Sequence, residues 1–503
     1  MNNHLISLMV FLPFLGALAQ AVLPTSSSRW VTLAASLGSS IFAVALVATM
    51  QAATSDLQAT ETLPWVGAYA ISYEMGIDGL NALLVLLVAI IFPLLVAAEW
   101  NQKMGVRGFH ALLLLLQTAL LGTVCAQDFF LLFFFWSLAA LPFYFLIGIW
   151  GGEHRESAAF RSTVAAAIGN AFFFAALVLV YYSIEPHTFS LHELAGGKLA
   201  GKSFAFLGHD LPVPAVAFFL MGVGLALRTP IWPFHGWFTE VAEEAPSTVF
   251  VALAGIAVPV SAYIFIRVCY SLFPETVAQC ANGIVIVGVI NLVIGGICAV
   301  AQRSLKLLLA YICLSEVGLV LIGIGSLSAI GVVGAIYQVL ALGLGVAGFG
   351  LCAGIMSERT GQTRFLKTGE ARESEKGFGG IAAQAPGMAV VAGVVVASLL
   401  GFPGLTGFVG HSLLMIGSYS VHPTAVLLSG AAFLLATYYL FTMYRYVFFG
   451  KTSEGSKPFT DLSLWEKAYL LPLVGCILVF GIYPKPLLEL VRPTVLTLLS
   501  TVK

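Results

Sequence analysis

The chain has 503 residues, of which 59% are hydrophobic and only 9% are charged, and its formal net charge is −1. A soluble protein carries roughly 25% charged residues, so this composition excludes one. Long apolar runs that do not alternate with polar residues also exclude a membrane β-barrel. We therefore expect an all-α polytopic membrane protein embedded in a lipid bilayer.

Apolar windows long enough to cross a bilayer recur from end to end, and we count fourteen of them. The first is expected to be retained as a span, because no basic residues precede its apolar core as they would in a signal peptide. The expected spans are 4–23, 30–52, 78–98, 108–126, 128–150, 163–184, 213–235, 247–272, 283–302, 305–326, 328–355, 384–420, 424–449 and 467–491.

Lysines and arginines are distributed unevenly between the loops that connect these spans. Fifteen of them fall in odd-numbered loops, whereas the even-numbered loops hold only Lys198 and Lys202. Because positively charged loops stay in the cytoplasm, the odd-numbered loops are expected there. Both termini are then expected outside the cytoplasm.

Two spans contain a break, and the breaks suggest an internal duplication. The seventh span is interrupted at 228–233, and the twelfth at 401–407 (GFPGLTG). Pro230 and Pro403 lie 173 residues apart, and the mid-span polar residues Ser137 and Glu316 lie 179 residues apart, so a unit of five spans fits both offsets. Five is odd, so the second copy would be inverted. The expected parts are 1–107 (helices 1–3), 108–272 (first repeat, helices 4–8), 283–449 (second repeat, helices 9–13) and 450–503 (helix 14).

Ionisable residues accompany both breaks. Arg228 and His235 flank the first, His411 follows the second, and Glu316 lies in the middle of the tenth span. A charge beside a helix break inside lipid is costly and is typical of an ion path. For each residue a structural role stays open. Arg228 could bond the carbonyls freed at Pro230, the histidines could bond carbonyls as neutral rings, and Glu316 could form a structural pair.

Three further charged residues are expected to serve structure. Asp78 and Asp128 each stand at the start of a span, where a carboxylate caps the helix. Arg267 is expected to anchor the end of the eighth span at the membrane interface.

Five segments together resemble the proton-translocating, antiporter-like subunits of respiratory complex I, and the chain M type in particular. They cover the third to the thirteenth span, and the resemblance extends to related cation-antiporter and inorganic-carbon uptake subunits. The segments are GIDGLNALLV (76–85), the run from FFFW to IWGG (133–152), LRTPIWPFHGWFTEVAEEAPSTV (227–249), KLLLAYICLSEVGLVLIGI (306–324) and ASLLGFPGLTGFVGHSLLM (397–415).

The resemblance also exposes departures at the family's usual proton-relay positions. The fifth-span glutamate is replaced by Ser137, the eighth-span lysine by Pro259 and the eleventh-span histidine by Leu342. The seventh-span lysine is Arg228, a group that hardly releases a proton. Glu316 stands at the tenth-span histidine, and His411 at the twelfth-span glutamate. We take Arg228, Glu316, His411 and His235 as the candidate proton path.

The resemblance implies a membrane-arm subunit of a proton-translocating NADH:quinone oxidoreductase in the bacterial inner membrane. Partners would be other membrane-arm subunits and protons, and no nucleic acid is expected. This chain would hold no redox cofactor and no metal, with NADH, FMN, iron–sulfur clusters and quinone on other subunits. Two alternatives stay open: a divergent paralogue that builds the arm without pumping, or a transport subunit for cations or inorganic carbon.

Overall fold

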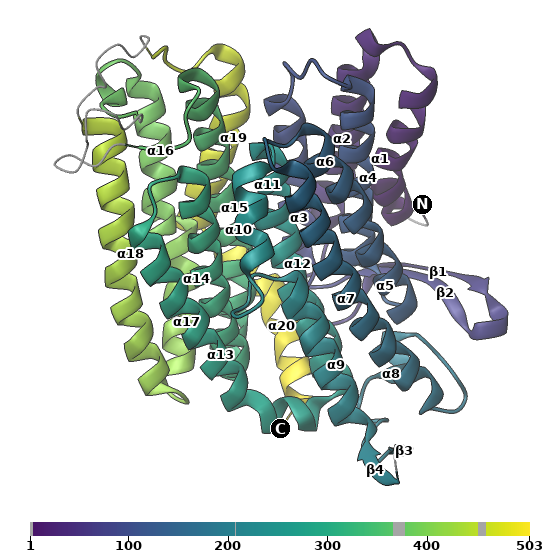
Figure 1. The fold of residues 1–503 in the computed structure, drawn as a ribbon. Helices are drawn as coiled ribbons and strands as arrows, with labels where there is room; N and C mark the ends of the chain where they lie inside the picture. Colours follow the sequence, from purple (N-terminus) through teal and green to yellow (C-terminus); the bar gives the residue numbers. More distant parts are fainter. Residues whose placement is uncertain (1–3, 207, 366–377, 451–458, 503) are drawn as a thin grey trace.

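The structure, a computed structural model, describes residues 4–206, 208–365, 378–450 and 459–502. Long helices run side by side in a broad bundle, and two small hairpins extend from it (Figure 1). Within the described residues, eleven helices are long and apolar enough to cross a membrane. Three shorter apolar helices fall on the remaining expected ranges, so the prediction of an all-α polytopic membrane protein is confirmed.

The N-terminal part consists of successive apolar helices, joined by short connections except between α2 and α3, where residues 49–81 intervene. The first helix packs against the second and the fourth, and the fifth expected span is divided at Ala139. The helices are α1 (Leu5–Val22), α2 (Thr25–Ala48), α3 (Ala82–Ala98), α4 (Val106–Cys125), α5 (Phe129–Leu138), α6 (Ala140–Trp150) and α7 (Arg155–Tyr182).

The seventh and eighth spans are irregular, as their prolines predict. α9 (Val213–Arg228) ends at the expected break, and α10 (Gly236–Glu244) follows it. Pro259 lies in the first turn of α12, directly after a π-helical segment, so a local change in hydrogen-bond spacing accommodates its missing N–H. The eighth span consists of α11 (Ser247–Ala252), the π-helical η2 (Leu253–Ala257), α12 (Val258–Ile264) and the π-helical η3 (Phe265–Tyr270).

The C-terminal part surrounds one long buried helix, α15. In its most apolar segment, 94% of the residues are buried, the highest share among the candidate spans. The reason is that α14, α16, α17, α19 and α20 all pack on this helix. The second expected break separates α16 from α17 at residues 400–405. The helices are α13 (Pro274–Ala301), α14 (Leu305–Gly325), α15 (Ala329–Thr360), η4 (Ile381–Ala383), α16 (Pro386–Leu399), α17 (Thr406–Tyr419), α18 (Pro423–Phe449), α19 (Leu464–Ile482) and α20 (Lys485–Val502).

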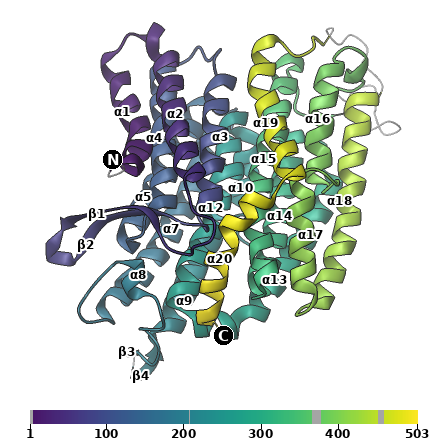
Figure 2. The same ribbon diagram turned by 180° about the vertical axis from the view of Figure 1, so that it is seen from behind.

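Several elements outside the spans differ from the sequence-based expectation. The last span ends at Ile482 rather than at residue 491, and α20 then runs across the back of the bundle (Figure 2). Two antiparallel hairpins also lie in loops for which no strands were expected. Their elements are β1 (Gln58–Val66), η1 (Gly67–Tyr69), β2 (Ile71–Ile77), α8 (Leu191–Leu194), β3 (Ser203–Phe206) and β4 (His209–Pro212). The inverted repeat stays a prediction.

Candidate functional site

Glu316, His411 and Gln338 form one buried cluster between α14, α15 and α17. Oε2 of Glu316 lies 3.1 Å from Nε2 of His411. Nε2 of Gln338 lies 2.7 Å from the same carboxylate oxygen and 3.0 Å from the same imidazole nitrogen. The side chains of Glu316 and His411 are only 13% and 6% exposed. The structure therefore brings together two of the four residues of the candidate path.

Glycines let the three helices approach closely enough to form this cluster. A Cβ at Gly410 would lie 2.0 Å from Oε1 of Gln338, so only glycine lets α17 pack on α15 here. Gly401, in the break before α17, has φ +65°, and a Cβ there would lie 2.6 Å from Nδ1 of His411. The imidazole therefore lies directly against the interrupted backbone.

The cluster has the chemistry of a single-proton relay. One proton between Glu316 and His411 satisfies both groups, whether the carboxyl or the imidazole carries it. Nδ1 of His411 is buried and has no hydrogen-bond partner among the described residues. An imidazole can accept a proton at one nitrogen and release another from its second nitrogen. His411 could thus take up a proton on the side of the break and pass one to Glu316.

Arg228 belongs to a separate cluster in the first half of the chain. Its Nη1 donates to the carbonyl of Trp136 at 2.9 Å and to Oδ1 of Asn170 at 2.8 Å. The guanidinium also stacks over the Trp136 ring, 3.9 Å from its centroid. Among the described residues Arg228 forms no salt bridge. Arg228 is therefore held by neutral groups, and it makes no contact with Glu316 or His411 through these hydrogen bonds.

The carbonyl freed at the first break is bound by Asn291 and not by Arg228. Nδ2 of Asn291 donates to the carbonyls of Pro230 at 3.1 Å and of Leu314 at 2.8 Å. Its Oδ1 accepts from the Trp232 N–H at 2.8 Å. The suggestion that Arg228 bonds the Pro230 carbonyl is thus wrong.

His235 stands alone at the start of α10. Its ring centroid lies 6.4 Å from that of Tyr311, and its buried Nδ1 has no partner in the described part of the chain. Neither Arg228, Glu316 nor His411 forms a recorded hydrogen bond with it. The structure does not bring it into either cluster.

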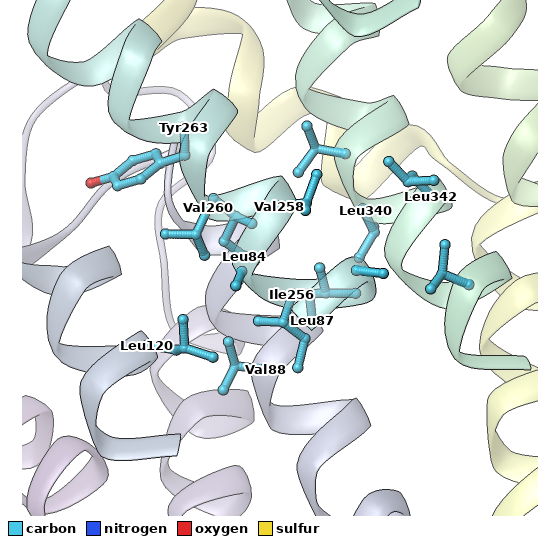
Figure 3. Packing of buried hydrophobic residues seen from close by; sticks show 14 of the residues in the cluster. Leu84, Leu87, Val88, Leu120, Ile256, Val258, Val260, Tyr263, Leu340 and Leu342 are labelled. Atoms are coloured by element: carbon cyan, nitrogen blue, oxygen red, sulfur yellow. The ribbon is translucent and has the colours of Figure 1, made fainter. Parts of the chain in front are cut away.

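A mostly apolar cavity borders both clusters. A cavity of about 700 Å³ lies between α9, α12, α13, α14 and α15, and its lining includes Pro259 and Leu342. The direct neighbours of Arg228 (Thr229), of Glu316 (Val317) and of Gln338 (Val339) also line it, but no charged residue in the described part of the chain does. Beside it, side chains of η2 and α12 pack against those of α3, α4 and α15 (Figure 3). The labelled residues are Leu84, Leu87, Val88, Leu120, Ile256, Val258, Val260, Tyr263, Leu340 and Leu342.

Ser137, the third replaced relay position, lies on α5 beside Trp136. Its Oγ is buried and has no hydrogen-bond partner among the described residues. Two of the three replaced positions therefore border the apolar cavity, and the third adjoins the Arg228 cluster.

Sequence reasoning missed three amides that hold these sites together: Asn170, Asn291 and Gln338. Asn291 and Gln338 are almost fully buried, at 0% and 2% exposure. Each is an amide within an otherwise apolar stretch, INLV and YQVL. A buried amide needs hydrogen-bond partners, so a single amide within an apolar span could have indicated a polar contact between helices.

Asp128 forms the expected helix cap, whereas Asp78 binds the turn before α3, whose N-cap residue Asn81 has no side-chain cap hydrogen bond. Oδ1 of Asp128 accepts from the Leu131 N–H at 2.9 Å, at the start of α5. Oδ1 of Asp78 accepts from the backbone N–H of Leu80 at 2.9 Å and of Asn81 at 3.2 Å, just before α3.

Comparison with known proteins gives the same assignment over nearly the whole chain. Residues 126–459 match the family model described as NADH:quinone oxidoreductase/Mrp antiporter, transmembrane. NADH-quinone oxidoreductase subunit M of Rhodobacter capsulatus is 28% identical over 98% of this chain and 96% of that protein. A chain of respiratory complex I from Thermus thermophilus superposes with a TM-score of 0.87 at 25% identity, covering 99% of this chain and 100% of that one.

A subunit of the Mrp complex from Dietzia sp. shares the fold, with a TM-score of 0.83 at 19% identity over 98% of this chain and 97% of that one. The sequence match extends across both helix breaks and the Glu316–His411 cluster. The chain is therefore a member of the NADH:quinone oxidoreductase/Mrp antiporter transmembrane family.

Proposed function

We propose that this chain is the M-type membrane-arm subunit of a proton-translocating NADH:quinone oxidoreductase, and that Glu316 and His411 carry its transferable proton. The observation that carries the proposal is a carboxylate and an imidazole 3.1 Å apart, buried beside a helix break. A buried pair of this kind changes charge whenever one proton enters or leaves.

The surroundings of the pair support this role. Nε2 of Gln338 lies within donating distance of both partners: it can donate to the carboxylate of Glu316 in either proton position, and to Nε2 of His411 when that nitrogen carries no proton. His411 presents its second nitrogen to Gly401 at the break, where the helical hydrogen bonding is interrupted. NADH oxidation and quinone reduction would occur on other subunits, which also hold FMN and the iron–sulfur clusters. The complex would lie in the bacterial inner membrane, with both termini of this chain outside the cytoplasm.

The proposal is tested by measuring protons taken up per NADH oxidised in inverted membrane vesicles. Glu316→Gln and His411→Ala remove the two titratable groups and should each lower this ratio while the complex still assembles. Ser315→Ala is the matched control, because Ser315 is the neighbour of Glu316 on α14 and donates to the Leu292 carbonyl instead. An unchanged ratio in both variants, with assembly intact, would contradict the role of the pair.

The second candidate is a subunit that builds the membrane arm without moving protons. The apolar cavity and the isolation of Arg228 favour it, because no charged residue among the described ones lines the cavity that borders both clusters. It predicts that Glu316→Gln alters assembly or stability but not the ratio of protons to NADH.

A cation-transport role predicts a different result. Replacing sodium by a large organic cation would then change transport, whereas it would leave NADH-driven proton uptake unaffected under the first proposal.

A further inference from the structure

A small cavity with a few polar groups in its lining adjoins Arg228 and has no part in the proposed proton transfer. Its volume is about 40 Å³, and it lies between α5, α6, α7, α9, α10 and the eighth span. Since one water molecule needs about 10–15 Å³, the cavity has room for about three waters, or for one small ion with a water beside it. Its polar lining consists of Arg228, Trp237, Ser162 and Thr163 and the remainder is apolar.

The functional groups around this cavity are mainly hydrogen-bond donors. Arg228 is only 9% exposed, and both of its recorded hydrogen bonds are made by Nη1. Nε1 of Trp237 is buried, can only donate, and has no acceptor among the described residues. Among the residues that the structure describes, no aspartate or glutamate lines the cavity. The site thus offers a permanent positive charge and an unused N–H group without a carboxylate to match them.

A buried cation without a countercharge is strongly unfavourable in an apolar surrounding. The Trp136 carbonyl, the Asn170 amide and the Trp136 ring stabilise the guanidinium, but each of them is neutral. A water molecule would be a further neutral partner, whereas an anion would also balance the charge.

We infer that this cavity binds a small monovalent anion such as chloride, with Arg228 as its countercharge and the Trp237 indole as a directional donor. Arg161, next to Ser162 on α7, has a 61% exposed side chain and pairs with Glu240 of α10 at the surface. The inference does not depend on proton pumping.

The test measures how much of this subunit stays soluble after heating the purified native assembly. Chloride is compared with gluconate, which is too large for the cavity, at constant sodium concentration and ionic strength. Chloride should raise the midpoint temperature of the wild-type subunit, because a ligand that binds only the folded state stabilises it. No difference between chloride and gluconate would mean that the cavity holds water only, and would overturn the inference.

Two variants localise the effect. Trp237→Phe keeps the ring but removes the donor, and should weaken the apparent chloride affinity about tenfold or more. Ser137→Glu adds a tethered carboxylate beside Trp136, and should abolish the chloride effect. Trp232→Phe is the matched control, because Trp232 lines the large apolar cavity instead. If both Trp237→Phe and Ser137→Glu retain the wild-type response, the anion binds elsewhere and the assignment is wrong.

Discussion

Arg267 and Asp78 form a buried ion pair, with 2.6 Å between the guanidinium Nη2 and the carboxylate Oδ1. Their side chains are 8% and 3% exposed, and the Arg267 Nε also donates to the Tyr263 hydroxyl at 3.1 Å. The pair joins the start of α3 to the end of the eighth span. Arg267 is therefore the buried ion-pair partner of Asp78 and not only an interfacial anchor.

Breaking this pair should destabilise the subunit strongly. Asp78→Asn would leave the Arg267 charge buried and unpaired, at a cost of about 3–5 kcal/mol. Lys485→Ala is the control, because Lys485 and Glu489 form an exposed pair at 3.7 Å that contributes about 0–1 kcal/mol. The measurement is the unfolding free energy of the subunit in detergent. Similar losses in the two variants would contradict this account.

The Asp128 cap should make stability depend on pH. Burial raises the pKa of this carboxyl to about 6, although hydrogen bonds from the backbone N–H groups of Leu131 and Ser72 oppose the shift. The folded state then binds a proton more tightly than the unfolded chain does. Stability should fall as the pH rises from about 4 to about 6, by at most about 3 kcal/mol, and stay level above that window.

Asp128→Asn should remove this dependence and keep the cap, because asparagine caps helices as well as aspartate does. The check is the unfolding midpoint of both proteins from pH 4 to 8. Asp56→Asn, at an exposed loop position, should behave as the wild type does. Parallel curves for the wild type and Asp128→Asn would refute the assignment.

The second helix break should matter through one contact with the proton-carrying pair. Gly401 and Gly404 both have positive φ, +65° and +87°, so alanine strains the backbone at either position by about 1 kcal/mol. At Gly401 the added Cβ would meet His411. At Gly404 no atom lies within 4 Å of the position that the added Cβ would take. Gly401→Ala should therefore lower the number of protons taken up per NADH, and Gly404→Ala should not. Equal effects on proton uptake would show that backbone strain, and not the imidazole, is responsible.

The sequence predicted the helices well because each span is a long apolar run. Both breaks were also foreseen, since prolines and glycines interrupt a helix wherever they occur. The hairpin formed by β1 and β2 was missed because its strands carry mixed polar and apolar residues and one proline, Pro64. The end of the last span was placed too late because α20 continues with apolar residues after a short interruption at Tyr483 and Pro484.

The candidate site could be predicted only in its parts. Glu316 and His411 were recognisable one by one, because an ionisable residue inside an apolar span is rare. Their contact spans 95 residues of sequence and depends on how α14, α15 and α17 pack. The separation of Arg228 from the pair has the same origin. Periodicity and composition carry no information about such distances.

Asn291 should be essential for the first break, because it binds three backbone groups, two in the break itself and one in α14. Asn291→Leu keeps the size of the side chain but leaves the Trp232 N–H and the carbonyls of Pro230 and Leu314 without this partner. The expected loss is about 2–5 kcal/mol, since each unsatisfied buried group costs about 1–3 kcal/mol and some relaxation is possible.

The control for Asn291→Leu is a second amide with a smaller role. Gln302 donates only to the Cys298 carbonyl at 3.1 Å in its own helical turn, so Gln302→Leu should cost less than about 1 kcal/mol. Unfolding in detergent measures both losses. Because Asn291 alone ties α13 to the Pro230 and Leu314 carbonyls, Asn291→Leu should also loosen the loop before α10 and speed its cleavage by protease. A variant that loses no stability and resists protease as the wild type does would mean that the break is held by other contacts.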